Sequence, residues 1–122
     1  MSGIVQYVLV RTDLGWPLGA MIAQACHACT AIIHQSYNDA DTQAYLADVD
    51  NMHKVVLEID GAEMEQLREK LDQDSIQFKL WVERPEIIAT CLATKPYPKN
   101  KVQSHFKKFK LLKVYNGCKD DV

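Results

Sequence analysis

Long apolar runs and a secretion signal are both missing from this sequence of 122 residues. Since no run of about 18 apolar residues or more occurs, we expect no membrane-spanning helix. Residues 1–6 lack the basic start and the apolar stretch of a signal peptide. We therefore expect a cytoplasmic protein that does not have a membrane among its partners.

Several common functional motifs are also absent. The sequence contains no P-loop, no Gly-x-Gly-x-x-Gly and no Gly-x-Ser-x-Gly, which argues against nucleotide hydrolysis, dinucleotide binding and serine-hydrolase chemistry. It has no internal repeat, no low-complexity tract and no linker, and its length suits one ordinary domain. We expect a single domain over residues 1–113, followed by a loosely held tail at 114–122.

The charges are divided unevenly along the chain, although the net charge is only −2. Residues 1–94 carry 14 acidic and 6 basic side chains, whereas residues 95–119 carry 8 lysines and no acid. Such a basic block favours a polyanion as partner, and the alternative is a solvated helix face that binds nothing. The candidate RNA-binding residues are Lys95, Lys99, Lys101, Lys107 and Lys108.

The hydrophobic pattern predicts alternating strands and helices. Strands are expected at residues 4–11, 53–60, 77–83 and 87–94, and helices at 18–34, 42–49, 62–73 and 98–109. Asp39 or Asp41 should cap the second helix, and Asp60 with Glu63 forms the pattern of a capping box. This order predicts an α/β fold of three layers, with a mixed four-stranded sheet and helices on both of its faces.

A narrow polar stripe runs along the otherwise apolar first helix. Ala20, Gln24, His27, Ala31 and His34 follow the spacing of one helix face. A buried amide and imidazole need hydrogen-bond partners, and beside the end of a sheet they could orient a water or a carbonyl group. The alternative is a core Gln and His whose polar atoms contact the backbone.

Two other groups are candidates for chemistry. Glu83 lies beside Arg84 at the end of a predicted strand and could be a base or a positioning group, or simply part of a surface ion pair. Cys26 and Cys29 form a Cys-x-x-Cys, but it lies well inside the helix, and no second Cys-x-x-Cys or His-x-x-x-His supplies further metal ligands. We expect no metal site and interpret both cysteines as small core residues with free thiols, while a thiol-redox or metal protein stays an alternative.

The motifs together resemble the peptidyl-tRNA hydrolase II family. Members typically read Val-Val-Arg-x-Asp-Leu, Gly-Lys-Ile-Ala-Ala-Gln-x-x-His-Ala and Lys-Lys-Val-Val-Leu, which is similar to LVRTDL at residues 9–14, GAMIAQACHA at 19–28 and HKVVL at 53–57. The sequence is more similar still to a divergent branch, the peptidyl-tRNA hydrolase domain-containing proteins, through WPLGA at 16–20, LWVERPE at 80–86 and PYPK at 96–99.

The resemblance implies an ester hydrolase without a cofactor, which frees a peptide from the 3′ end of tRNA. Gln24 and His27 match the family's helix positions, Glu83 stands for the family's aspartate, and Thr90 matches a family threonine. The family's lysine, however, falls on Ala20, and the loop after the third strand is shortened to residues 83–87. Arg11 and Asp13 would be structural or lie at the edge of the site.

Two functions follow from this resemblance. The first is a peptidyl-tRNA hydrolase, weakened by the two replacements, with Gln24, His27, Glu83 and Thr90 as catalytic residues. The alternative is a non-catalytic module that binds tRNA or a protein on the same fold. The implied partner is tRNA or peptidyl-tRNA rather than DNA, and a homodimer is left open because family members are often dimers.

Overall fold

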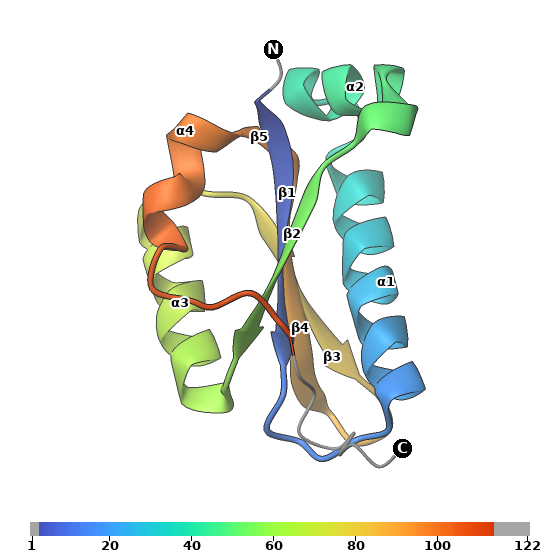
Figure 1. Cartoon of the computed structure of the whole chain (residues 1–122), viewed down its shortest axis with the longest axis vertical. Coiled ribbons are helices and arrows are strands. Elements are labelled where there is room, and N and C mark those ends of the chain that lie inside the picture. Colours follow the sequence, from blue (N-terminus) through green and yellow to red (C-terminus); the bar gives the residue numbers. More distant parts are fainter. Residues whose placement is uncertain (1–2, 114–122) are drawn as a thin grey trace.

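The computed structural model describes residues 3–113, which form a twisted sheet with helices on both of its faces (Figure 1). The sheet has the strand order β2-β1-β4-β3, and a short fifth strand pairs with β1. The strands are β1 (Ile4–Arg11), β2 (Lys54–Ile59), β3 (Phe78–Glu83), β4 (Ile88–Thr94) and β5 (Tyr97–Pro98). The helices are α1 (Leu18–Gln35), α2 (Ala40–Ala47), α3 (Gly61–Gln73) and α4 (Lys99–Val102), with short 3₁₀ turns at Val49–Asn51 and Gln103–His105.

The predicted mixed α/β sheet is confirmed. β1 and β2 are parallel and are connected through α1 and α2, whereas β4 runs antiparallel to both β1 and β3. β5 is not among the predicted strands, because two residues that include a proline are too short for a periodic pattern. The predicted tail at 114–122 lies outside the described residues.

Each face of the sheet has its own hydrophobic core. On one face α1 packs through small and flexible side chains, among them Ala28 and Met21, onto Val8, Val10 and Ala93. Small residues allow the helix to approach the sheet closely, and close packing of this kind is the normal state of protein interiors. The opposite core contains more large side chains and is formed by α3 and by residues 102–109 against the sheet.

Helix ends follow the predicted capping chemistry. In α3 the Asp60 carboxylate accepts a hydrogen bond from the backbone N–H of Glu63, and the Glu63 carboxylate accepts one from the N–H of Asp60. At the start of α2, Asp39 rather than Asp41 is the cap, with its carboxylate accepting from the N–H groups of Asp41 and Thr42. A cap of this kind is typically worth about 1 kcal/mol.

The predicted last helix at 98–109 is wrong in its length. α4 ends at Val102, and a 3₁₀ turn and further turns replace the rest. Val102, Phe106 and Phe109 of this segment are nevertheless buried, and the Phe106 ring stacks on Tyr7 with 4.3 Å between ring centroids. Packing on the sheet therefore decides the backbone here, since so short a segment has little helix stability of its own.

The chain then passes along the outer edge of β2. The backbone N–H of Glu58 donates to the carbonyl of Lys110 at 2.9 Å, and the N–H of Leu112 donates to Val56 at 3.0 Å. The segment around Leu111 therefore docks on the domain through β2. Among the helices described, none has the length and hydropathy that crossing a bilayer requires.

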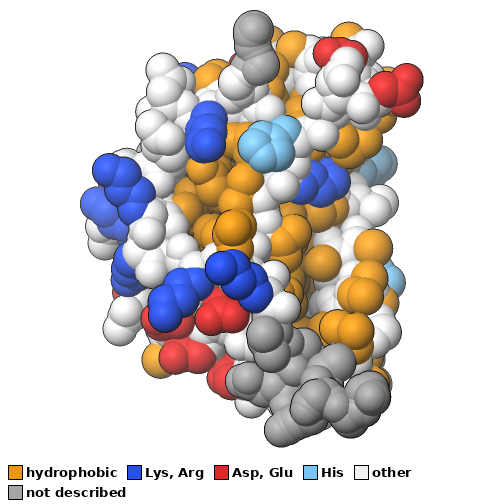
Figure 2. Space-filling model, in the orientation of Figure 1, with side chains coloured by type: hydrophobic (Ala, Val, Ile, Leu, Met, Phe, Trp, Pro, Cys, Tyr) orange, Lys and Arg blue, Asp and Glu red, His pale blue; other side chains and the backbone are white. Residues whose placement is uncertain are grey.

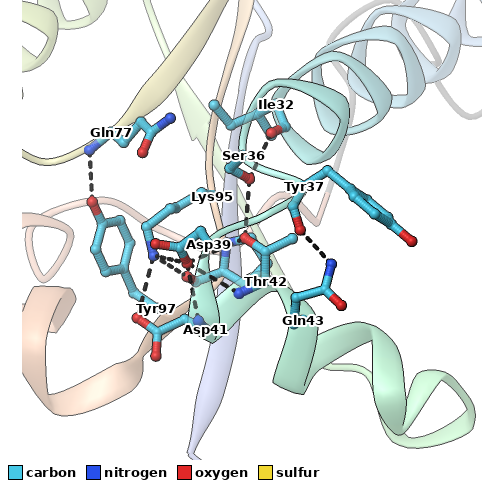
Figure 3. A network of polar contacts seen from close by, with 11 residues as sticks. Ile32, Ser36, Tyr37, Asp39, Asp41, Thr42, Gln43, Gln77, Lys95 and Tyr97 are labelled. Atoms are coloured by element: carbon cyan, nitrogen blue, oxygen red, sulfur yellow. Dashed lines mark hydrogen bonds and ion pairs between the residues drawn. The ribbon is translucent and has the colours of Figure 1, made fainter.

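Lys95 lies inside the protein, where it connects the end of β4 to the cap of α2 (Figure 3). Its side chain is 6% exposed, and its ammonium is 2.9 Å from the Asp39 carboxylate and 3.2 Å from that of Asp41. The ammonium also lies 3.8 Å from the centroid of the Tyr97 ring. The pKa of Asp39 is lowered overall, because the ion pair with Lys95 and two backbone N–H groups outweigh burial, which acts in the opposite direction.

We predict that Lys95→Met lowers the free energy of unfolding by about 1–3 kcal/mol at pH 7, because it leaves carboxylates without their cation. Since the folded-state pKa of Asp39 is depressed, its stabilising effect exists above its unfolded pKa of about 3.9 and is lost as the pH falls. The difference from the unmodified protein in urea unfolding should therefore shrink towards about pH 3. The exposed control Lys99→Met should change stability by less than about 0.5 kcal/mol, and equal effects of both variants would contradict this role.

Candidate functional site

The candidate site lies where α1 crosses β4 and β3. Gln24 is 3% exposed and lies between α1 and the sheet, while His27, one turn further along, is exposed. Thr90 is fully buried on β4, and Glu83 is half-buried at the end of β3. Of the two polar side chains of the predicted stripe, His27 therefore reaches solvent and Gln24 does not.

Thr90 reaches α1 because β4 contains a β-bulge. Trp81 pairs with Cys91, and the next residue, Val82, pairs with Ala89, so that Thr90 is the extra residue on its strand. In a regular strand Ala89 and Cys91 would share a face, but they pack into the cores on opposite sides of the sheet. The bulge redirects the Thr90 side chain towards α1, a common use of bulges near functional sites.

A buried hydrogen bond joins the helix to this bulge. The Thr90 hydroxyl donates to the Gln24 side-chain oxygen Oε1 at 2.9 Å. The Gln24 amide nitrogen Nε2 has no hydrogen-bond partner among residues 3–113, although the side chain is almost completely buried. Because buried polar groups are normally hydrogen-bonded, this amide is a donor for which the described part of the chain supplies no acceptor.

His27 and Glu83 both contact Trp81. The imidazole of His27 lies 4.9 Å from the Trp81 ring, measured between centroids, and the indole N–H donates to Glu83 Oε1 at 3.0 Å. Trp81 and Glu83 are two residues apart on β3 and therefore point to the same face of the sheet. Trp81 is the one residue of this group that was not predicted as a site residue, although its two-residue spacing from Glu83 was visible in the sequence.

Two surface hollows meet at Trp81. One, of about 380 Å³, is lined by residues of α1 that include His27 and His34. The other, of about 420 Å³, is lined by residues 79–84 and includes Glu83. A ligand that spans both would contact the imidazole and the carboxylate on either side of one indole ring.

The turn after Glu83 is short and has an unusual backbone. Ile87 has a φ of 59°, which is an outlier for a β-branched residue, and its side chain is 65% exposed. The N–H of Ile87 donates to the carbonyl of Glu83 at 2.7 Å and closes the turn. Strained residues of this kind are concentrated at functional sites, and here the strain lies directly beside the candidate carboxylate.

Arg11 and Asp13 support the loop that leads into α1. The Arg11 guanidinium forms two hydrogen bonds of 2.9 Å to the Asp13 carboxylate and a third to the backbone carbonyl of Ala89, next to the bulge. The hydrogen bond from Arg11 is the main reason why the pKa of Asp13 is lowered. Both residues therefore act at the margin of the site, as expected from the sequence.

The predicted RNA-binding lysines do not surround these residues. α4 lies on the α3 side of the sheet, opposite α1 (Figure 1). Lys99, Lys101, Lys107 and Lys108 are exposed there, but Lys108 shares a hollow with Glu58, Asp60 and Glu63. Figure 2 shows Lys and Arg side chains on this side of the molecule, the lower ones next to acidic side chains. Lys95 belongs to the buried ion pair described above and is not available to a phosphate.

The cysteines of α1 lie in the middle of the helix, as predicted. Cys26 is exposed, so its interpretation as a core residue is wrong, whereas Cys29 is partly buried against the core and Cys91 is buried on β4. All three are free thiols. Burial raises the pKa values of Cys29 and Cys91. The thiolate forms that redox or metal chemistry needs are thus disfavoured at these two positions. No group of three or more His, Cys, Asp or Glu side chains within residues 3–113 has a geometry suited to a metal ion.

Comparison with known proteins identifies relatives over nearly the whole chain. The family Peptidyl-tRNA hydrolase PTH2 matches residues 4–112. The mouse protein named "Putative peptidyl-tRNA hydrolase PTRHD1" is 47% identical over 116 residues, which cover 90% of this chain and 83% of the mouse protein. The human protein of the same name gives the same identity and coverage.

We predict that Thr90→Val lowers the free energy of unfolding by about 1–3 kcal/mol, because it leaves the buried Gln24 oxygen without a donor. Thr90→Val combined with Gln24→Leu should cost less than the sum of the two single variants, by about 0.5–3 kcal/mol. Urea unfolding of the four proteins tests this, with Thr30→Val on the exposed side of α1 as a matched control. Strict additivity would show that the two side chains do not depend on each other.

Proposed function

Because this chain belongs to the peptidyl-tRNA hydrolase PTH2 family, we propose that it hydrolyses the ester bond of peptidyl-tRNA, and that Gln24, His27, Glu83 and Thr90 form the site. The observation that carries the proposal is the buried amide of Gln24, which is held by Thr90, lies one helix turn from His27, and has no acceptor for its nitrogen among residues 3–113. A buried donor held in this way is suited to a carbonyl oxygen that gains negative charge during hydrolysis.

Ester hydrolysis needs a water molecule that loses a proton and an oxyanion that is stabilised. In the proposed mechanism, His27 or Glu83 takes the proton from a water between the two hollows that meet at Trp81. The water oxygen attacks the ester carbonyl. The Gln24 amide donates a hydrogen bond to the developing oxyanion once substrate binding has opened the packing over it, because Gln24 lines neither hollow in the free protein. The bond to the ribose oxygen then breaks, and that oxygen takes the proton from the protonated His27 or Glu83 as tRNA leaves. Thr90 is a positioning residue, because its hydroxyl holds the Gln24 amide group.

The activity should be low compared with that of family members that carry the lysine. Ala20 lies one turn before Gln24 on the same stripe of α1, so the cation that the family has there is missing. Loss of one electrostatic stabiliser typically costs about 10²–10³ in rate. Glu83 in place of aspartate moves the carboxylate by a methylene group, and an error of about 1 Å in placement can cost about 10².

The exposed lysines are the proposed contacts to the tRNA backbone. Lys99, Lys101, Lys107 and Lys108 lie on the face opposite α1, so they would hold a part of the tRNA distant from its 3′ end. Such contacts depend on phosphate charge rather than on sequence, and affinity should fall as the salt concentration rises.

Turnover of a defined peptidyl-tRNA, measured beside a family member that carries the lysine, tests the proposed hydrolysis. We expect slow release of peptide above the buffer rate, and a loss of about 10²-fold or more in His27→Ala. The exposed imidazole of His53, remote from Trp81, provides the matched control His53→Ala, which should keep full activity. No hydrolysis above buffer between about pH 6 and 9 by folded protein would reject the proposal.

The second candidate function is tRNA binding without hydrolysis, and Ala20 is the observation that favours it. Restoring the family groups with Ala20→Lys and Glu83→Asp should raise the turnover rate, by about 10²-fold or more if only these groups are missing. Salt-dependent tRNA binding by the unmodified chain, with no turnover before the restoration, would support the binding module. An unchanged turnover rate in the double variant would show that the site has lost more than these two groups.

A further inference from the structure

A second surface site lies on the other side of α1, over the edge strand β2. It is a groove of about 490 Å³, which is in the range of small-molecule binding sites. α1 contributes Ala25, Cys29 and Ile33 to its wall, and β2 contributes Val56. Figure 2 views this side of the molecule and shows hydrophobic side chains that reach the surface between β2 and α1.

The groove exists because the helix does not cover the whole sheet. α1 packs mainly on β4, β3 and β1, so the side of β2 that faces α1 is left without a helix. Val56 is 37% exposed and Met52, just before the strand, is 42% exposed as a result. The α2 residues Tyr45 and Leu46 close one end of the groove.

One fixed cation lines this apolar groove. The ammonium of Lys54 donates to the Gln6 side-chain oxygen and to the Tyr45 hydroxyl, at 3.4 Å for the latter. Gln6 is itself fully buried and anchored, since its amide nitrogen donates to the carbonyl of Thr94 at 3.0 Å. The protein thus holds the ammonium in place with neutral groups at the wall of the groove.

Within residues 3–113, Lys54 has no carboxylate partner. An ammonium has three N–H donors, and the described residues accept from two of them. Lys54 as a whole is exposed, and partial desolvation at the groove lowers the pKa of its ammonium. A bound anion would compensate the charge of this ammonium.

We propose that this groove binds a monocarboxylate with an apolar chain, whose carboxylate pairs with Lys54 and whose chain lies along Ala25, Cys29 and Val56. A charge-assisted hydrogen bond would fix the head of the ligand. Each buried methylene group of the ligand should lower its Kd by about fourfold.

Two kinds of molecule share this chemistry: a fatty carboxylate, and a peptide that ends in apolar residues with a free carboxylate. Cys26 and Thr30 line both this groove and the hollow at His27, but His27, Glu83 and Trp81 do not line the groove, so binding here does not depend on the proposed hydrolysis. The experiment below uses no tRNA, and its failure would leave the proposed function untouched.

Calorimetry with decanoate, decanol and a tri-leucine peptide, acetylated at its N-terminus, tests the proposal on the full chain. The peptide is used once with a free C-terminal carboxylate and once as the amide. We expect at least one carboxylate to bind at least tenfold more tightly than its neutral counterpart, and that ligand should protect the exposed thiol of Cys26, at the groove, from alkylation. Preference for decanoate would identify a lipid-type ligand, and preference for the peptide acid a peptide end.

Three variants locate the binding. Lys54→Met should remove the preference for the carboxylate, while Lys101→Met, an exposed lysine on α4, should keep it. Val56→Trp, at a partly exposed position, should fill the groove and abolish binding without unfolding the protein. Three results would each overturn the proposal: equal affinity for the acid and the neutral ligand, a preference that survives Lys54→Met, or no binding at all. Thermal melting verifies that every variant is folded.

Discussion

The buried hydrogen bond between Thr90 and Gln24 ties α1 to β4, in a helix whose depth on the sheet is set by small apolar side chains. It is a polar contact inside a layer of small apolar side chains, and it depends on a β-bulge that directs Thr90 to the helix side. With α1 fixed there, His27 is brought onto Trp81, and Trp81 in turn donates to Glu83. In this position α1 does not cover β2. The placement of one helix therefore shapes both the candidate site and the groove on the other side of α1.

The lysines demonstrate that charge along a sequence differs from charge on a surface. The block that begins at Lys95 contains eight lysines and no acid, but Lys95 is buried against Asp39 and Asp41, and Lys108 lies near acidic residues from other parts of the chain. The positive electrostatic potential that attracts a polyanion is therefore weaker than the sequence alone indicates. A cation held in place by neutral groups is found outside that block, at Lys54, whose ammonium donates to Gln6 and to Tyr45.

The elements of the fold could be predicted because their signals are local. Alternation, helical spacing, the Asp39 cap and the Asp60–Glu63 capping box all act within a few residues. The bulge at Thr90, the burial of Lys95 and the bare face of β2 depend on contacts between distant segments, so no spacing in the sequence could reveal them. The predicted length of the last helix was wrong for the same reason, because the position of Phe106 depends on its contact with Tyr7 and not on helix propensity.

For the candidate site, helical spacing alone placed Gln24 and His27 on one stripe, but it could not tell which of them reaches solvent. That depends on how deeply each turn of α1 sinks into the sheet, and the small side chains of the sheet decide this. Trp81 was overlooked because a large aromatic residue in a strand usually belongs to the core. Its indole N–H is what distinguishes it, since that group gives a carboxylate at the strand end a fixed orientation.

The pairing of residues 110–112 with β2 has a consequence for solubility. An uncovered edge strand can accept the strand of another molecule and start aggregation. Here the backbone hydrogen bonds to Lys110 and from Leu112 occupy polar groups of β2 that would otherwise be free for such pairing. Residues 110–112 thus protect this edge of the sheet from pairing with another molecule. A chain shortened before Lys110 would lose this protection.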